Sequence, residues 1–591
     1  MENEYIDYFT NLLAPAHDRH FRAVGAALCV LGIVNGMQLV SHVGTSILEW
    51  KITVRPLVPS SRIIAFCAPI ANKFVSTRDG WTDDISHGRV FAIRKLVEIA
   101  TQVPGTYLYG TLIARPWINH VKAALAISKP NRVHTEATIS VMSRQSARFS
   151  AEVVDVLLAA ATGMLLPSAI FVPYLMKFDI NTLDFPDAML YDDTDYLNLV
   201  LENRAFFAIS WGDAVTKIVP HLHYLRHRYG TSLKAIKREN GFSPCINDGF
   251  QTSTALSPCI PSCCSECVLV TGVIVVVLHF TAQYKTTRGD LDLIDKSCFQ
   301  KMHPWFAHNY SCAVIKYNCY AQDLTSPPPG ALDWLERVAL RTIVFMHCSE
   351  FVMPESIREF PSLMGIELWN TTLVRWGEES ALSAELHPMM LFLIMGYVNM
   401  TEVPTGILRF PPLARLTDLE FTHTNLTALP DSVADSWSNV EVLYIEHSQL
   451  NRFPRVVMKI PVLSELSLID NKIATMPDDV LITAASTYFY DLALSRNPLR
   501  KLPDARNEAF GVSLLSLEFT QIVELPLWVH TNVWEYVSLG GSPICEEGHN
   551  ASLTGIDICG QDDNSWDPLG EQRFPTQLVE PLRMLKSQQT G

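Results

Sequence analysis

Charged residues are scarce in this sequence: they make up only 18% of its 591 positions, and the mean hydropathy is +0.14. Such a composition is unusual for a soluble protein of this length and indicates segments that bury themselves in lipid. Basic residues are outnumbered, with 46 Lys and Arg against 61 Asp and Glu. The net charge of −15 argues against nucleic acid as a partner, because phosphate binding needs a basic face. The length predicts about two or three domains.

Motifs for catalysis are also lacking. The sequence contains no Gly-rich phosphate loop, no Ser nucleophile elbow, no zinc-protease motif and no kinase catalytic loop. The cluster His221, His223 and His227 is interpreted as an interfacial or solvated helix face rather than a metal site. We therefore expect no enzyme activity, no cofactor and no metal.

Long uncharged runs are present in the first half of the chain. The run Cys267–Tyr284 would form a helix of about 27 Å, close to the thickness of the hydrocarbon core of a bilayer. A buried core segment is the competing interpretation. Weaker candidate spans cover residues 24–43, 153–176 and 205–225, the last containing Asp213 and Lys217. Residues 1–284 are thus predicted to form an α-helical multi-span membrane region.

Glycosylation sequons occur only after this region, which favours an extracellular or lumenal position for the second half of the chain. The sequon asparagines are Asn309, Asn370, Asn399, Asn425 and Asn550. An even number of cysteines follows the last candidate span, as expected for disulfides in an oxidising compartment. They are Cys298, Cys312, Cys319, Cys348, Cys545 and Cys559. The last two suit closure of the C-terminal end, and the other pairings stay open.

Four further cysteines lie just before or at the start of the last candidate span: Cys259, Cys263, Cys264 and Cys267. Beside a membrane they are candidates for S-acylation. A zinc site is the alternative, but their spacing matches no ordinary ligand set.

A repeat with the pattern LxxLxLxxNxLxxLP fills the C-terminal half, in nine in-phase units. Residues 463–477 show the pattern fully, from Leu463 to Pro477. The last apolar residue recurs at intervals of 23 to 27, at Met353, Trp376, Val403, Leu429, Phe453, Met476, Leu502 and Leu525. These intervals lie in the range of about 20–29 residues for leucine-rich repeats. The pattern predicts an α/β leucine-rich-repeat solenoid over residues 340–560.

The units depart from the pattern in places. The Asn position holds Asn only at Asn471 and Asn497, and Val398 there should make its unit irregular because it cannot form the usual hydrogen bonds. Glu350 occupies an apolar position of the first unit. Residues 285–339 are interpreted as a Cys-containing cap with a Pro-rich linker, and residues 561–591 as a disordered tail.

The concave face is where a ligand would bind, because strand side chains that do not point into the core face that side. The residues between and after the two inward apolar positions form an acidic stripe with aromatics, typical of a protein-binding surface. They are Glu367, Trp369, Glu420, His423, Tyr444, Glu446, His447, Asp470, Arg496, Glu518 and Phe519.

The arrangement of spans, a cap and repeats resembles the multi-span leucine-rich-repeat membrane proteins of oomycetes. The cap residues Pro304–Phe306, Tyr310–Cys312 and Asn318–Cys319, and the closing Ser542–Cys545, carry the resemblance. It covers about the last 250 residues. It implies a membrane protein with a receptor-like repeat domain. No kinase pattern follows the repeats, so we expect signalling to depend on a partner.

We therefore expect a plasma-membrane glycoprotein whose extracellular repeats bind a protein, peptide or glycan in recognition or adhesion. Its other partners would be the lipid bilayer and a signalling co-receptor. An intracellular scaffold at a membrane is one alternative, in which the sequons are unused. A transporter or channel with accessory repeats is another, although Asn35, Gln38, Asp155 and Asp213 are few polar residues for a path.

Overall fold

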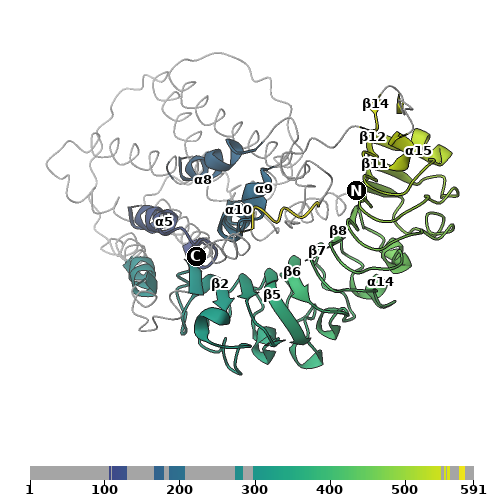
Figure 1. The fold of residues 1–591 in the computed structure, drawn as a ribbon. Coiled ribbons are helices and arrows are strands. Elements are labelled where there is room, and N and C mark those ends of the chain that lie inside the picture. The colour runs from purple at the N-terminus through teal and green to yellow at the C-terminus, as the bar shows by residue number, and fades with distance from the viewer. Residues whose placement is uncertain are drawn as a thin grey trace, which may run out of the picture.

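A curved sheet of twelve strands runs through residues 298–538 (Figure 1). The computed structural model describes residues 106–107, 109–128, 161, 165–178, 185–206, 270, 273–283, 297–546, 552–553, 556–559 and 572–579. The strands are β1 (Cys298–Lys301), β2 (Cys312–Asn318), β3 (Thr342–Met346), β4 (Phe351–Val352), β5 (Gly365–Arg375), β6 (Phe392–Asn399), β7 (Asp418–Thr422), β8 (Val442–Glu446), β9 (Glu465–Ser467), β10 (Tyr488–Ala493), β11 (Gly511–Ser516) and β12 (Val533–Ser538). β1 pairs antiparallel with β2, and all later neighbours are parallel.

Each repeat contributes one strand to the concave side and returns along the convex side. The returns contain short helices: η3 (Glu355–Glu359), η4 (Glu378–Ser380), η5 (Thr405–Ile407), α14 (Val433–Ser436), η6 (Arg455–Lys459) and α15 (Leu527–Asn532). The inward residues of the pattern form the core between these layers; Leu466 and Leu468, for example, are buried. Each such burial contributes about 1.5–3 kcal/mol, but only when a neighbouring repeat covers it.

Asparagines at the pattern's Asn position form hydrogen bonds with backbone N–H and C=O groups of their own and adjacent repeats. The Nδ2 of Asn471 donates to the carbonyls of Ile445 at 2.7 Å and Leu468 at 3.1 Å, and its Oδ1 accepts the N–H of Leu450 at 3.0 Å. The unit with Val398 is irregular in the expected place. There β5 and β6 extend past the usual end, so that Val398 pairs with Thr371 through the backbone and its side chain is buried.

The cap closes the N-terminal end of the core through two disulfides. Cys298 is bonded to Cys312 across the β1–β2 hairpin, and Cys319 is bonded to Cys348 in the first repeat. Because β2 already pairs in parallel with β3, the solenoid sheet begins before Leu340, where the repeat pattern first appears. The Pro-rich segment is packed on the repeats rather than a free linker, since Pro327 is buried and the hydroxyl of Ser326 accepts the N–H of Val352 at 3.0 Å.

The C-terminal end is closed by a third disulfide, between Cys545 and Cys559. Cys545 lies in α16 (Pro543–Glu546), and Cys559 follows the small antiparallel pair β13 (Ser552–Leu553) and β14 (Ile556–Asp557).

Helices from the first half of the chain lie on the concave side of the sheet (Figure 1). They are α5 (Pro116–Ser128), α8 (Leu166–Leu175), α9 (Asp187–Leu190) and α10 (Asp193–Phe206). Glu202 of α10 accepts the Tyr174 hydroxyl of α8 at 2.7 Å and forms an ion pair at 3.1 Å with Arg115, the residue directly before α5.

The predicted spans fall mostly outside the described residues. Span 24–43 lies outside entirely, 205–225 lies outside beyond its first two residues, and the acylation cysteines lie outside as well. Of the span 267–284, residues 273–283 are helical, and α8 covers the end of the span 153–176. Among the helices described, none combines the length and apolar character needed to cross a bilayer.

Candidate ligand-binding surface

Three rows of side chains cross the concave face, because the parallel register aligns equivalent positions of successive strands. The first row, before the first inward residue, includes Asp418, Glu465 and Asp491. The second, between the inward residues, includes Glu367, Glu420 and Tyr444. The third, after them, includes Trp369, Glu446 and Glu518.

Seven acidic side chains lie on these rows, and all seven are buried. They are Glu367, Asp418, Glu420, Glu446, Glu465, Asp491 and Glu518, none more than 5% exposed. The sequence pattern indicated four of the seven and missed Asp418, Glu465 and Asp491. The period of two along a strand was the signal for them, since each lies two residues before a second-row position.

The helices α9 and α10 pack over part of this acidic surface. The hydroxyl of Tyr191 donates to Glu420 Oε1 at 2.9 Å, and the ring of Tyr196 packs edge-on against Phe392 at 5.9 Å. Lys316 Nζ, on β2, forms a buried ion pair with Asp193 at 3.0 Å. Aromatic and charged contacts together therefore attach the N-terminal helices to the strands.

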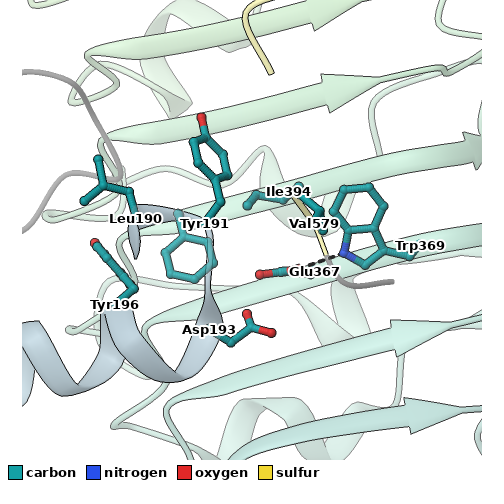
Figure 2. A pocket seen from close by; sticks show the side chains of 9 residues that line it. Leu190, Tyr191, Asp193, Tyr196, Glu367, Trp369, Ile394 and Val579 are labelled. Carbon is teal, nitrogen blue, oxygen red and sulfur yellow. Dashed lines mark hydrogen bonds between the residues drawn. The ribbon is translucent and has the colours of Figure 1, made fainter. Parts of the chain in front are cut away.

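Glu367 lies at the edge of a small cavity beneath this cover, as Figure 2 shows. Trp369 Nε1 donates to its Oε2 at 2.7 Å. Burial raises the pKa of Glu367 well above its ordinary value, and the nearby Asp193 raises it further, whereas Trp369 and Lys316 act in the opposite direction. The protonated carboxyl is therefore favoured, which lowers the cost of burying it.

A second cover comes from residues 572–579, the short yellow segment beside α10 in Figure 1. This corrects the expectation that residues 561–591 are all disordered. Arg573 and Phe574 are buried on the concave face, because the acidic rows provide partners that the local sequence does not reveal. Glu446 contacts both: burial raises its pKa, while hydrogen bonds from Ser467 and from the backbone of the segment lower it.

The concave face ends in a row of residues with left-handed backbone, which we call the ladder edge. Its members occupy the same position of successive repeats, with φ from +47° to +60°: His347, Asn370, Tyr397, His423, His447, Asp470, Arg496 and Phe519. Gly541 continues the row at φ +73°. Their spacing repeats that of the sequence pattern.

Side chains of the ladder edge stack on one another. The rings of Tyr397 and His423 lie 4.2 Å apart and those of His423 and His447 lie 4.3 Å apart, in stacked geometry. His447 Nδ1 lies 2.8 Å from Asp470 Oδ2, and the Arg496 guanidinium covers the Phe519 ring at 4.5 Å. Burial, with His447 close by, lowers the pKa of His423 to about 4. The stack therefore contains an imidazole that stays neutral at physiological pH.

The eleven residues predicted for ligand binding thus form two groups. The six on the second and third rows are buried: Glu367, Trp369, Glu420, Tyr444, Glu446 and Glu518. The five on the ladder edge remain open or half-buried: His423, His447, Asp470, Arg496 and Phe519. Pattern alone missed Tyr397, which is 38% exposed and continues the stack.

Sequon asparagines lie on the surface of the repeat region. Asn309, Asn370, Asn399 and Asn425 are exposed, and Asn550 lies outside the described residues. Asn370 belongs to the ladder edge and its Nδ2 lies 2.9 Å from His347 Nδ1. A glycan there would crowd one end of the edge.

No protein-family model matches the chain. Among solved structures it is similar to a leucine-rich-repeat protein of Leptospira interrogans, with 19% identity and a TM-score of 0.27 over 32% of this chain and 46% of that one. It is also similar to InlP of Listeria monocytogenes, with 18% identity and a TM-score of 0.29 over 39% and 62%. A third similar structure is the plant peptide hormone receptor RGFR1 in complex with RGF2, with 14% identity and a TM-score of 0.28 over 39% and 40%.

The chain spans less than two thirds of each of these three proteins. The fold rests on the molecule's own features: parallel strands in repeat register, inward leucines, an asparagine position that bonds adjacent turns, and capped ends. Residues 312–546 form a leucine-rich-repeat solenoid.

Proposed function

We propose that this protein is a membrane-anchored recognition protein whose leucine-rich repeats bind a protein or peptide ligand on the concave side, outside the cell. The observation that carries the proposal is the concave face itself. Its rows hold acidic and aromatic side chains on rigid strands, and they already accommodate a peptide segment of the same chain, residues 572–579. Rigid strands with aromatic anchors and directed charge suit peptide recognition.

An external position is supported by the disulfides and the sequons. Two disulfides lie at the N-terminal end of the solenoid and one at its C-terminal end, and such bonds persist in oxidising compartments. Four exposed sequon asparagines are accessible to glycosylation. Anchoring is proposed through residues 1–284, chiefly the uncharged run Cys267–Tyr284. A co-receptor would supply signalling.

The ladder edge is the part of the concave side open to a first contact. Phe519 is 37% exposed and Asp470 is exposed, while Arg496 is held over Phe519. An aromatic ring, a carboxylate and a guanidinium at fixed spacing make a recognition surface that costs little side-chain entropy to order, because the stack already orders it.

Photo-crosslinking tests this proposal directly. A benzophenone amino acid replaces Phe519 in the full chain expressed in cells, and in a matched control it replaces Val462, which is 45% exposed in the connection between η6 and β9. Irradiation should produce a discrete higher-mass adduct at Phe519 and none at Val462. The proposal fails if Phe519 yields no adduct, or if both positions yield the same adducts.

A further inference from the structure

Arg573 lies in a polar well on the concave face, only 3% exposed. Its Nε donates to Asp491 Oδ2 at 2.7 Å, and its Nη2 donates to the hydroxyl of Ser516. Asp491 belongs to β10 and Ser516 to β11, so adjacent strands hold the two partners. A guanidinium presents its donors in a rigid planar fork, and this pair of acceptors matches two of them.

Glu446 holds the backbone of the same segment. Its Oε1 accepts the N–H of Arg573 at 2.7 Å and its Oε2 accepts the N–H of Phe574 at 3.1 Å. The hydroxyl of Ser467 donates to the same carboxylate. One carboxylate thus binds two consecutive peptide groups, which fixes the direction and register of the bound chain on the sheet.

Phe574 fills an aromatic slot next to the well. Its ring is fully buried and lies 5.7 Å from Trp369 and 5.3 Å from Tyr191, edge-on to the latter. Tilted and edge-on aromatic pairs are favourable beyond the area they bury. A guanidinium well and an aromatic slot therefore lie side by side, spaced for adjacent residues of one peptide.

The acidic well favours an arginine for an energetic reason. A carboxylate taken out of water is costly unless a charged partner and hydrogen bonds compensate it. Asp491 and Glu446 are almost fully buried when the segment is bound, and Arg573 supplies both the charge and the donors. A peptide without a cation at this position would leave Asp491 buried without the ion pair that Arg573 supplies.

We propose that the concave face has a specific site for an arginine–aromatic dipeptide, which Arg573 and Phe574 occupy within the same chain. A peptide ligand with this pair binds by displacing the segment. This inference rests on the proposed function and names its ligand class. A tethered segment acts at an effective concentration of about a millimolar, so it should weaken a competing ligand by tenfold or more.

The test uses the full-length chain in detergent and a fluorescent peptide with the sequence of residues 571–579, followed by anisotropy. Arg573→Ala vacates the site and should bind this peptide at least tenfold more tightly than the unaltered protein does. Adding Asp491→Asn to that variant should weaken binding at least tenfold, and so should alanine in place of the peptide's arginine. Arg452→Ala, which removes an exposed arginine of the repeats, is the control and should match the unaltered protein.

A chain with Arg573→Ala that does not bind the peptide, or that binds it regardless of Asp491→Asn, would overturn the inference. Phe574→Ala vacates the site without changing any charge and should give the same gain. Trypsin gives a second measure: the Arg573–Phe574 bond should be protected in the unaltered protein and cut at least tenfold faster in Asp491→Asn. Equal cutting would also overturn it. Crosslinking at Phe519 does not use this well, so the proposed function could stand while this inference fails.

Discussion

At the residue scale, the ladder edge shows how one backbone position produces a row of functional groups. Left-handed φ is uncommon for residues other than glycine, yet eight successive repeats place a side chain there. His347, His423, His447, Asp470 and Asn370 belong to types that tolerate this region better than β-branched residues do. Stacking and hydrogen bonding between neighbouring side chains of the ladder edge offset the cost of this backbone conformation.

His423 makes the stability of the repeats depend on pH. Burial and His447 lower its pKa to about 4 in the folded state, against about 6.5 unfolded. The unfolded chain therefore binds more protons between these values, so the free energy of unfolding should fall as the pH falls from about 6.5 to about 4. Above pH 6.5 this contribution is fully present.

Thermal unfolding at pH 7.0 and pH 5.0 measures the effect. His423→Phe keeps an aromatic ring in the stack and should reduce the loss of Tm on acidification. His308→Phe, at an exposed position outside the ladder edge, should leave that loss unchanged. An unaltered pH dependence in His423→Phe would show that this imidazole does not titrate as described.

At the element scale, hydrogen bonds from asparagine side chains join adjacent repeats. Asn471 bonds to the backbone of four other residues, all buried. Asn471→Ala removes these bonds and leaves buried backbone groups without them. We expect a loss of about 2–4 kcal/mol in unfolding free energy, since each buried group left unsatisfied costs about 1–3 kcal/mol.

Denaturant unfolding of the variant measures this loss. The matched control is Asn451→Ala, at an exposed position of the preceding repeat, which should change stability by less than about 0.5 kcal/mol. Similar losses for the two variants would mean that the asparagine position adds nothing special to the stacking of repeats.

The strands of the solenoid could be predicted because each is specified by residues close together in the sequence. Two inward apolar residues with one residue between them define each strand, and their phase also predicted the irregular unit at Val398. The packing of α9, α10 and residues 572–579 on the concave face could not be predicted in this way. Tyr191 reaches Glu420 across 229 residues and Arg573 reaches Asp491 across 82. No periodicity in either partner's surroundings encodes such a contact.

At the scale of the whole molecule, the concave-face pattern contains both buried and open residues. The acidic stripe predicts an open binding surface, and its residues do lie on the concave face, but its row residues are buried and α9, α10 and residues 572–579 contact several of them. Among the residues predicted for ligand binding, those that stay open or half-buried lie on the ladder edge. The candidate site is therefore a surface in two parts, one exposed and one occupied by the chain itself.

The central claim is that the repeats face the outside of the cell, since the disulfides and access to an external ligand both depend on it. The most direct test is a mobility shift after glycosidase digestion of the full chain expressed in its own membrane. Replacement of Asn309, Asn370, Asn399, Asn425 and Asn550 by Gln is the control. We expect a shift that the control loses. Absence of any shift, with the repeats degraded by protease added to the cytoplasmic side, would contradict the account and place them inside.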